Sequence, residues 1–385
     1  MASEWTTVRA ADFIEFNPRL SLKKGVVATK VAMEKLQPFT KKIPAAELAE
    51  FAGGSKFCNG DTIMARITPC LENGKTAFVD ILADGEVAFG STEFIVMRAR
   101  PGVSDPQFVY YLATSPAFRN IAIKSMVGSS GRQRVQQGVL DELELTVPPL
   151  GEQQKIGAFL AMLDLKIALN NKINDNLHQQ AAALFANFYD HAETEVSFTE
   201  IIQILGGGTP KTGECSYWNG NVPFFTPKDV GSPYTLTTEK TITEEGLAHC
   251  NSRLYPVNTV FVTARGTVGK VGLPGVPIAM NQSCYALVGK DTHQLLVYFY
   301  TLKAVDRLKH KASGAVFDAI TTRDFESEII MKLSDEDAQG FLDVAEPIYQ
   351  AILSNSIENL RLATLRDSLL PKLMSGEIDV SAVQL

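Results

Sequence analysis

The segment from Pro148 to Asp190 constrains the fold of this chain more than any other. It has no proline after Pro149 and no glycine after Gly157, and it is rich in Leu, Ala, Gln and Lys, which favour helices. Its seam residues alternate at spacings of three and four, the pattern of a coiled coil, over roughly 43 Å of helix. The alternative is one long helix in the core of a single domain. The seam positions are Leu160, Leu163, Ile167, Asn170, Asn174, Leu177, Ala181, Leu184 and Phe188.

A second seam with the same spacing lies near the C-terminus, and we expect it to pair with the first. NKINDNL (171–177) resembles NSIENL (355–360) in local sequence. Ser334 and the three acidic residues after it are typical of a helix N-cap. Pro347 would kink this helix or delay its start unless it lies near the first turn. The second seam consists of Val344, Ile348, Ala351, Asn355, Glu358, Leu362, Leu365 and Leu369.

The composition predicts a globular protein with room for two domains, since 45% of its 385 residues are hydrophobic and 21% are charged. No apolar run reaches the ~18 residues that cross a bilayer. The N-terminus lacks a hydrophobic signal core, so we expect a cytoplasmic protein without membrane contact. Five cysteines without a CxxC pair predict free thiols, and neither a zinc site nor disulfides.

The net charge of −7 is unevenly distributed along the chain. Residues 1–149 carry 17 Lys+Arg and 16 Asp+Glu, and residues 194–333 carry 13 of each. The helical segments 150–193 (3 against 5) and 334–385 (3 against 9) hold the excess acid. A strongly basic DNA-binding protein is therefore excluded, whereas local basic faces on the two near-neutral regions remain possible.

Those two regions repeat the same order of elements. NTVFVTA (258–264) corresponds to DTIMARI (61–67), and IAMNQSCYAL (278–287) corresponds to VAFGSTEFIV (87–96). In each copy a helix follows, expected at 106–124 and 293–311, and then a loop, a strand and a long helix. The chain therefore reads as a tandem duplication of an α+β region followed by a long helix.

This duplication predicts the domain organisation. We expect an α+β fold with globular domains at 1–149 and 194–333 and long helices at 150–193 and 334–385. If the helices pair antiparallel, the two domains are related by a pseudo-twofold axis at the ends of a rod. DNA half-sites one helical turn apart lie about 34–36 Å from each other, a distance that such a rod spans.

The sequence contains no catalytic constellation. The text nearest to an adenine-methyltransferase motif, Asn17-Pro18-Arg19-Leu20, lacks the second proline and the aromatic residue, and no GxxxxGK[ST] phosphate loop is present. The five histidines stand apart from one another, and Gly206–Gly208 does not join a clear strand to a helix. These observations count against a fused methyltransferase–nuclease.

Four stretches resemble the specificity subunits of type I restriction-modification systems. They are PPLGEQQKIGAFLAMLDLKIALNNKINDNL (148–177), GGTP with YWNGNVPFFTPKDV (207–230), ARGTVGKVG (264–272) and LRDSLLPKLMSGEI (365–378). The resemblance covers essentially the whole chain. The second copy differs from the first in having MKLSDEDAQ (331–339) where the first has the PPLGEQ entry to its helix.

The resemblance implies a non-catalytic subunit with two target-recognition domains, each reading one half of an asymmetric, interrupted site in double-stranded DNA. Two methyltransferase subunits would dock on the helices, and restriction-translocase subunits would join the full complex. S-adenosylmethionine, ATP and magnesium would bind those partners, with no cofactor on this chain. The alternatives are a coiled-coil adaptor that binds only proteins and an inactive orphan subunit.

Reading DNA requires Arg, Lys, Asn, Gln or Thr side chains on loops that reach base edges. In the first domain the candidates are Arg66, Asn73, Lys75, Arg132, Gln133, Arg134, Gln136 and Gln137. In the second they are Lys211, Thr226, Lys228, Arg265, Thr267, Lys270, Asn281 and Gln282. For each residue the alternative is a solvated turn. The pairs Lys23–Lys24 and Lys41–Lys42 are weaker candidates that would hold phosphate, and Tyr217 and Trp218 are expected to pack under the GGTP loop.

The asparagines in the middle of both seams suggest a second role. A buried asparagine in a coiled coil costs stability and fixes register. We hypothesise that this polar middle aligns the helices and sets the number of unread base pairs, so that inserting one turn after Asn174 should lengthen the gap.

Overall fold

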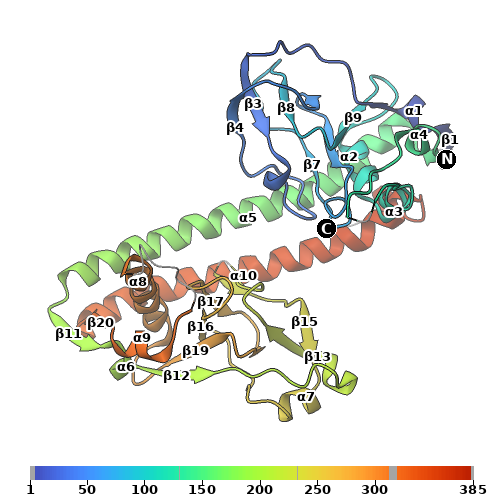
Figure 1. The fold of residues 1–385 in the computed structure, drawn as a ribbon. Helices are drawn as coiled ribbons and strands as arrows, with labels where there is room; N and C mark the ends of the chain where they lie inside the picture. The colour runs from blue at the N-terminus through green and yellow to red at the C-terminus, as the bar shows by residue number, and fades with distance from the viewer. Residues whose placement is uncertain (1–4, 130, 232, 312–318, 383–385) are drawn as a thin grey trace. The chain divides into compact units, whose positions relative to one another are not determined.

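The computed structural model describes residues 5–129, 131–231, 233–311 and 319–382. They form two compact units, each combining a globular region with a part of each long helix. Unit 1 consists of Met1–Ile167 and Arg361–Leu385, and unit 2 consists of Ala168–Leu360. Figure 1 traces the helices and strands of both.

Both long helices are present. α5 spans Leu150–His191 and α10 spans Asp335–Met374. The predicted N-cap of α10 is confirmed, because the Asp337 amide donates to Ser334 Oγ at 3.1 Å. Pro347 does not delay the helix, since it stands well inside α10. The proline costs one intrahelical hydrogen bond, and the buried neighbours Ala345 and Tyr349 hold the adjacent turns.

The two helices run antiparallel within unit 2. Asn170 Nδ2 donates to Glu358 Oε2 at 2.7 Å, and two turns later His178 Nδ1 lies 2.8 Å from the Tyr349 hydroxyl. Residue numbers thus rise along α5 as they fall along α10, as the pairing prediction requires. Asn170 and Asn174 are buried, in agreement with the polar seam expected at the centre.

On α10 the buried face lies one residue away from the predicted seam. Within unit 2 its buried residues are Phe341, Ala345, Tyr349 and Ile352, whereas Val344 is 49% exposed. In unit 1, Leu365 is 36% exposed. The seam prediction is wrong at Val344, Ala351 and Leu365, which are exposed. Neighbouring stripes of the helix have similar apolar spacing, and the stripe that packs in unit 2 carries the large aromatic residues Phe341 and Tyr349. Leu160, Leu163 and Ala181 of α5 are buried, and the half-buried seam positions are Ile167, Leu177, Leu184, Phe188, Ile348, Asn355, Glu358, Leu362 and Leu369.

Unit 1 contains two four-stranded sheets, ordered β2-β9-β6-β7 and β4-β3-β8-β5, and the antiparallel pair β1-β10. Its strands are β1 Thr6–Arg9, β2 Ile14–Phe16, β3 Val27–Val31, β4 Glu47–Glu50, β5 Lys56–Phe57, β6 Thr62–Ala65, β7 Thr76–Phe78, β8 Ala88–Gly90, β9 Phe94–Ala99 and β10 Glu144–Val147. Its helices besides the long pair are α1 Ala10–Phe13, α2 Pro106–Thr114, α3 Pro116–Lys124 and α4 Gln137–Asp141, with 3-10 turns at Met33–Lys35 and Val380–Ala382.

Unit 2 contains a five-stranded sheet, β12-β19-β16-β17-β14, a three-stranded sheet, β15-β13-β18, and the antiparallel pair β11-β20. Its strands are β11 Thr194–Ser197, β12 Ile202–Gly206, β13 Trp218–Phe225, β14 Tyr234–Thr235, β15 Lys240–Ile242, β16 Val260–Thr263, β17 Val271–Pro274, β18 Ala279–Met280, β19 Cys284–Gly289 and β20 Ile329–Lys332. Its helices are α6 Phe198–Ile201, α7 Glu244–Ala248, α8 Gln294–Lys311 and α9 Thr322–Glu326, with a 3-10 turn at Cys215–Tyr217.

The topology confirms the duplication. β2-β9-β6-β7 has the same order and antiparallel pairing as β12-β19-β16-β17. In the second sheet of unit 1, β3 pairs antiparallel with β4 and parallel with β8. In unit 2, β13 pairs in the same two ways with β15 and β18. In each unit one further antiparallel strand pair joins the start of the globular region to the strand before the long helix. These pairs are β1-β10 before α5 and β11-β20 before α10.

The helix predicted at 106–124 is two helices. Ser115 has φ −61° and ψ 144°, an extended conformation that ends α2 and starts α3. Pro116 explains the break, because the residue before a proline disfavours the helical region. By contrast, the helix predicted at 293–311 is continuous as α8.

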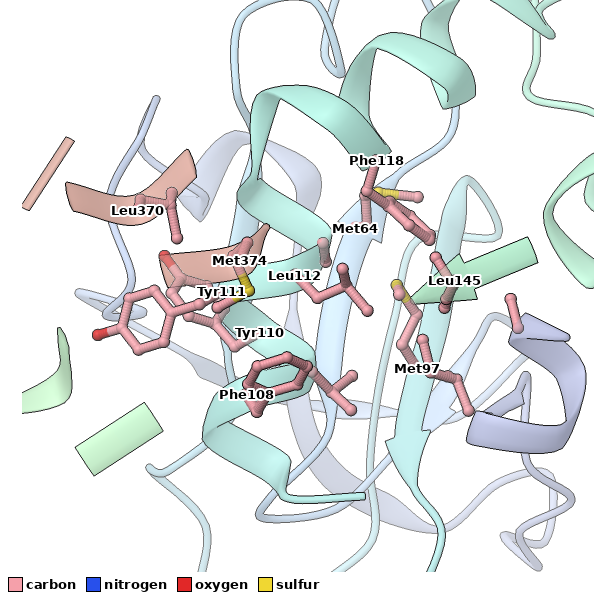
Figure 2. Close-up of a cluster of buried hydrophobic side chains, with 14 of the residues drawn as sticks. Met64, Met97, Phe108, Tyr110, Tyr111, Leu112, Phe118, Leu145, Leu370 and Met374 are labelled. Carbon is pink, nitrogen blue, oxygen red and sulfur yellow. The ribbon is translucent and has the colours of Figure 1, made fainter. Parts of the chain in front are cut away.

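The core of unit 1 joins the sheet to both long helices. Figure 2 shows Phe108, Tyr110 and Tyr111 of α2 beside Leu370 and Met374 of α10. The entry to α5 is equally tight: a Cβ on Gly157 would lie 3.0 Å from the Phe108 amide nitrogen. Buried Gln153, from the GEQQ stretch, donates to the Pro148 carbonyl at 2.9 Å and to the Val103 carbonyl at 3.1 Å. The helix entry is therefore part of the packed core.

Candidate nucleic-acid interface

Four loops of unit 2 meet at one place. Thr267 Oγ1 donates to the Pro227 carbonyl at 3.1 Å, and the Arg265 amide donates to the Ser283 carbonyl at 3.3 Å. Thr209 of the GGTP loop hydrogen-bonds the side chain of Gln282. The loops 207–211, 226–229, 265–270 and 281–283 therefore form one cluster, the unit 2 loop cluster. It carries Lys211, Thr226, Lys228, Arg265, Thr267, Lys270, Asn281 and Gln282.

The turn at the centre of this cluster connects β16 to β17. Gly266 and Gly269 have φ of +83° and +74°, the left-handed region that glycine adopts without strain. The Gly269 amide donates to the Thr263 carbonyl at 2.8 Å and closes the turn. Arg265 and Lys270 are exposed, and no described residue accepts a hydrogen bond from either side chain. Both cations are thus presented to solvent on a short, fixed turn.

Other members of the cluster hold the loops in shape. Thr226 Oγ1 donates to Asp229 Oδ2 at 2.6 Å, and Asn281 Oδ1 accepts from the Ser283 amide at 3.1 Å. Lys228 lies 3.8 Å from Glu239 in an exposed ion pair. Trp218 Nε1 donates to the Lys211 carbonyl at 3.2 Å, so this ring lies beside the GGTP loop as expected. The Tyr217 ring instead stacks on His249, with 5.0 Å between the ring centroids.

In unit 1 two loops pair in the corresponding place. The Thr68 amide donates to the Gln133 carbonyl at 3.0 Å, and the Val135 amide donates to the Arg66 carbonyl at 2.9 Å. The structure therefore brings the loops 66–75 and 132–137 together as the unit 1 loop cluster. It contains Arg66, Asn73, Lys75, Arg132, Gln133, Arg134, Gln136 and Gln137.

Several cations of the unit 1 loop cluster already have internal partners. Arg134 Nη2 lies 2.6 Å from Glu93 Oε1, and its Nε donates to the same carboxylate. Lys75 Nζ donates to the Met33 carbonyl at 3.0 Å. Arg66 Nη2 donates to the Val135 carbonyl at 3.3 Å. The exposed Arg132 is the cation of this cluster that is open to a ligand among the described residues.

Lys41, a weaker candidate for phosphate binding, is held inside unit 1 by aromatic side chains. Its Nζ lies 4.7 Å from the centre of the Tyr111 ring and 3.1 Å from the Tyr111 hydroxyl. Burial lowers the pKa of Lys41 to about 8. A half-buried ammonium held over aromatic rings is poorly placed to contact DNA phosphate.

Residues 3–179 and 193–339 both match the family model of the type I restriction modification DNA specificity domain. The chain belongs to this family. The two matches cover the two copies of the repeat, and they confirm the resemblance found in the sequence.

Curated relatives agree with this assignment. The type I restriction enzyme HindI specificity subunit of Haemophilus influenzae is 26% identical, with 83% of this chain and 86% of that protein covered. The MjaIX specificity subunit of Methanocaldococcus jannaschii is 32% identical over 31% of this chain and 29% of its own length. The crystal structure of a type I S subunit from M. genitalium shares the fold, with a TM-score of 0.54 at 15% identity, covering 97% of this chain and 96% of that one.

The protein is therefore a DNA sequence-recognition subunit of a type I restriction-modification system, a role that includes binding DNA and assembling with other subunits of such a system. Within the described residues of this specificity subunit, no group of three or more His, Cys, Asp or Glu side chains could hold a metal ion. No helix in the same part of the chain is long and apolar enough to cross a membrane.

Two cationic side chains that the sequence did not single out lie over the turns that contain Gly74 in unit 1 and Gly269 in unit 2. In unit 1, Arg119 of α3 donates to the carbonyls of Leu71 and Glu72, at 3.3 and 2.6 Å. In unit 2, the side chain of Lys309 of α8 lies against Gly269. The basic run RLKHK (307–311) at the end of a predicted helix is the available signal, but its position beside Gly269, forty residues before Lys309, depends on tertiary folding.

Proposed function

We propose that each unit of this specificity subunit reads one half of a bipartite, asymmetric DNA site. The observation that carries the proposal is the repeat, in which each unit has its own sheets, its own loop cluster and a part of each long helix. The two clusters present different side chains, Arg132 and Gln133 in unit 1 and Arg265 and Lys270 in unit 2. Different donors and acceptors suit different base sequences, so the two half-sites are expected to differ.

We propose further that α5 docks methyltransferase subunits of the complex. Met162, Leu165, Leu169 and Ile173 follow one another at spacings of three or four, and their exposed fractions are 52, 51, 48 and 47%. An exposed apolar stripe of this kind is typical of a surface that a partner covers. We propose that two methyltransferase subunits dock on the helices, with restriction-translocase subunits joining the full complex.

In this proposal the chain itself catalyses no reaction. The absence of an Asn/Asp-Pro-Pro-aromatic motif and of a phosphate loop from its sequence supports that role. S-adenosylmethionine, ATP and Mg²⁺ would bind the partner subunits, and this chain would supply the position on DNA at which they act.

A long-read methylome of cells with and without this gene, each co-expressing the neighbouring methyltransferase, tests the proposal. We expect one asymmetric, gapped adenine-methylation motif to depend on the gene, which would also reveal both half-sites. A methylome identical in the two strains would contradict the proposal and favour an orphan subunit or an adaptor that binds only proteins.

A further inference from the structure

We propose that Lys270 and Lys309 of unit 2 form a clamp for the phosphate backbone of DNA, beside the turn that carries Arg265. The inference rests on the proposed DNA-reading role of the unit 2 loop cluster, and it adds an element outside that cluster, helix α8. Its ligand is a phosphodiester group, which any DNA sequence supplies.

The clamp lies in a surface groove of about 470 Å³. Lys270 is the residue directly before β17, and Lys309 comes from the last turn of α8. The apolar part of the groove lining includes Val271, Leu302 and Val305. Among the described residues that line the groove, Asp306 is the single carboxylate, so these residues carry two positive charges and one negative charge.

Gly269 lets the two elements approach each other. A Cβ on this residue would lie 2.6 Å from Cε and 3.4 Å from Nζ of Lys309, and 3.2 Å from Cγ1 of Val305. The absence of a side chain therefore allows the Lys309 ammonium to lie against the turn. Lys309 is exposed, and among the described residues none accepts a hydrogen bond from its ammonium group.

The repeat provides a comparison within the same chain. The Lys75 carbonyl accepts from the Ala65 amide at 3.0 Å, as the Lys270 carbonyl accepts from the Thr263 amide at 2.9 Å, so these two lysines occupy equivalent positions. Lys75 Nζ is bonded to the Met33 carbonyl. Arg119, which lies over the unit 1 turn, is bonded to the carbonyls of that turn.

The equivalent cations thus serve the fold in unit 1 and remain open to a ligand in unit 2. Two ammonium groups beside a DNA-reading turn suit an anion that approaches together with the bases, which is the phosphate backbone. Such a contact positions the protein on DNA and carries no sequence information. Unit 2 should therefore provide the larger share of sequence-independent affinity through this clamp.

The test uses the complex of full-length specificity subunit with its methyltransferase, bound to fluorescent duplexes between about 50 and 200 mM KCl. One duplex contains the methylated motif and the other an unrelated sequence. The variants are Lys270→Gln, Lys309→Gln and the double substitution. Lys303→Gln on the same helix is the matched control, because its ammonium lies 5.2 Å from the Tyr189 ring, outside the groove lining.

We expect each clamp substitution to reduce the slope of log K against log salt by about 0.9, and to weaken both duplexes by the same factor. Asp306→Asn should tighten both duplexes at low salt. The methylated motif should not change.

Slopes of the clamp variants equal to that of Lys303→Gln would overturn the clamp, as would a loss confined to the cognate duplex. If the wild-type complex itself failed to prefer the cognate duplex, the proposed function would be wrong instead. Thermal unfolding of each variant separates loss of binding from loss of fold.

Discussion

At the scale of single residues, His178 couples the folding of unit 2 to pH. Its ring lies edge-on to Tyr298 and Tyr349, and Nδ1 is 2.8 Å from the Tyr349 hydroxyl. Burial lowers the pKa of His178, an effect that the nearby Asp175 partly opposes. Since the unfolded histidine has a pKa of about 6.5, the unfolded chain binds the proton first as pH falls. The free energy of unfolding should therefore decrease below about pH 6.5.

His178→Gln tests this coupling. Glutamine keeps a polar partner for Tyr349 and does not take up a proton, so this variant should lose less Tm than the wild type between about pH 7.5 and 5.5. Differential scanning fluorimetry of the full chain measures the two profiles. His249→Gln, at an exposed histidine stacked on Tyr217, is the control and should follow the wild type. Equal pH profiles for wild type and His178→Gln would contradict the coupling.

Arg265 carries the residue-scale prediction about specificity. Arg265→Ala should relax one half-site by about 1–3 kcal/mol for each lost bidentate contact with a base. Binding to duplexes substituted at each position of both half-sites provides the measurement, and the second half-site is the internal control. Equal weakening of both half-sites would make Arg265 a folding residue.

At the scale of secondary-structure elements, unit 1 joins α5 to α10 through a nearly buried ion pair. Arg366 Nη1 lies 2.5 Å from Asp164 Oδ1, with side chains 17% and 12% exposed. The Tyr111 hydroxyl donates to the other oxygen of Asp164 at 2.5 Å. One carboxylate thus connects both long helices to α2.

Arg366→Leu should therefore destabilise the protein by about 3 kcal/mol, because it leaves a largely buried carboxylate without its cation. Urea unfolding of the full chain measures the change. Arg361→Leu, at an exposed position on the same helix, is the matched control and should cost far less. Adding Asp164→Asn to Arg366→Leu should recover part of the loss, and no recovery would show that the arginine acts through packing alone.

The sequence predicts the elements better than the way they face one another. Heptad spacing locates α5 and α10, and the alternation of short apolar runs with loops locates the strands, because both signals are local. Which side of α10 packs near Val344 cannot be predicted from local sequence, because it depends on aromatic residues of other elements. The partners of the cations are equally hidden: Glu93, which binds Arg134, stands forty-one residues before it. The sequence therefore predicts which loops carry candidate DNA-binding residues. Only the structure shows which of their cationic side chains are already bonded within the protein and which are exposed.

At the scale of the whole molecule, duplication explains why one chain carries two different loop clusters on a shared plan. Copies with the same sheet order can diverge in their loops without loss of the core, because loops tolerate substitution better than packed strands. Arg119 and Lys309 illustrate the outcome, since one supports its turn and the other is exposed beside it. Each long helix runs from one unit into the other along the chain, so we propose that the two helices set the spacing between the half-sites.

Lengthening both helices together should lengthen the unread gap in the DNA site. The insertion proposed after Asn174 would interrupt the contacts of unit 2, because Asn355 Nδ2 donates to Asn174 Oδ1 at 2.9 Å and Asn170 bonds Glu358 one turn away. One helical turn of four residues therefore belongs at the boundaries of the units, after Ile167 in α5 and after Leu360 in α10. About 6 Å of added helix corresponds to at most about two base pairs.

The methylome of cells expressing the doubly extended chain should show unchanged half-sites and a longer gap. An insertion in α5 alone, the control, should misalign the helices and reduce methylation, and an unchanged gap in the doubly extended chain would refute the helices as its ruler.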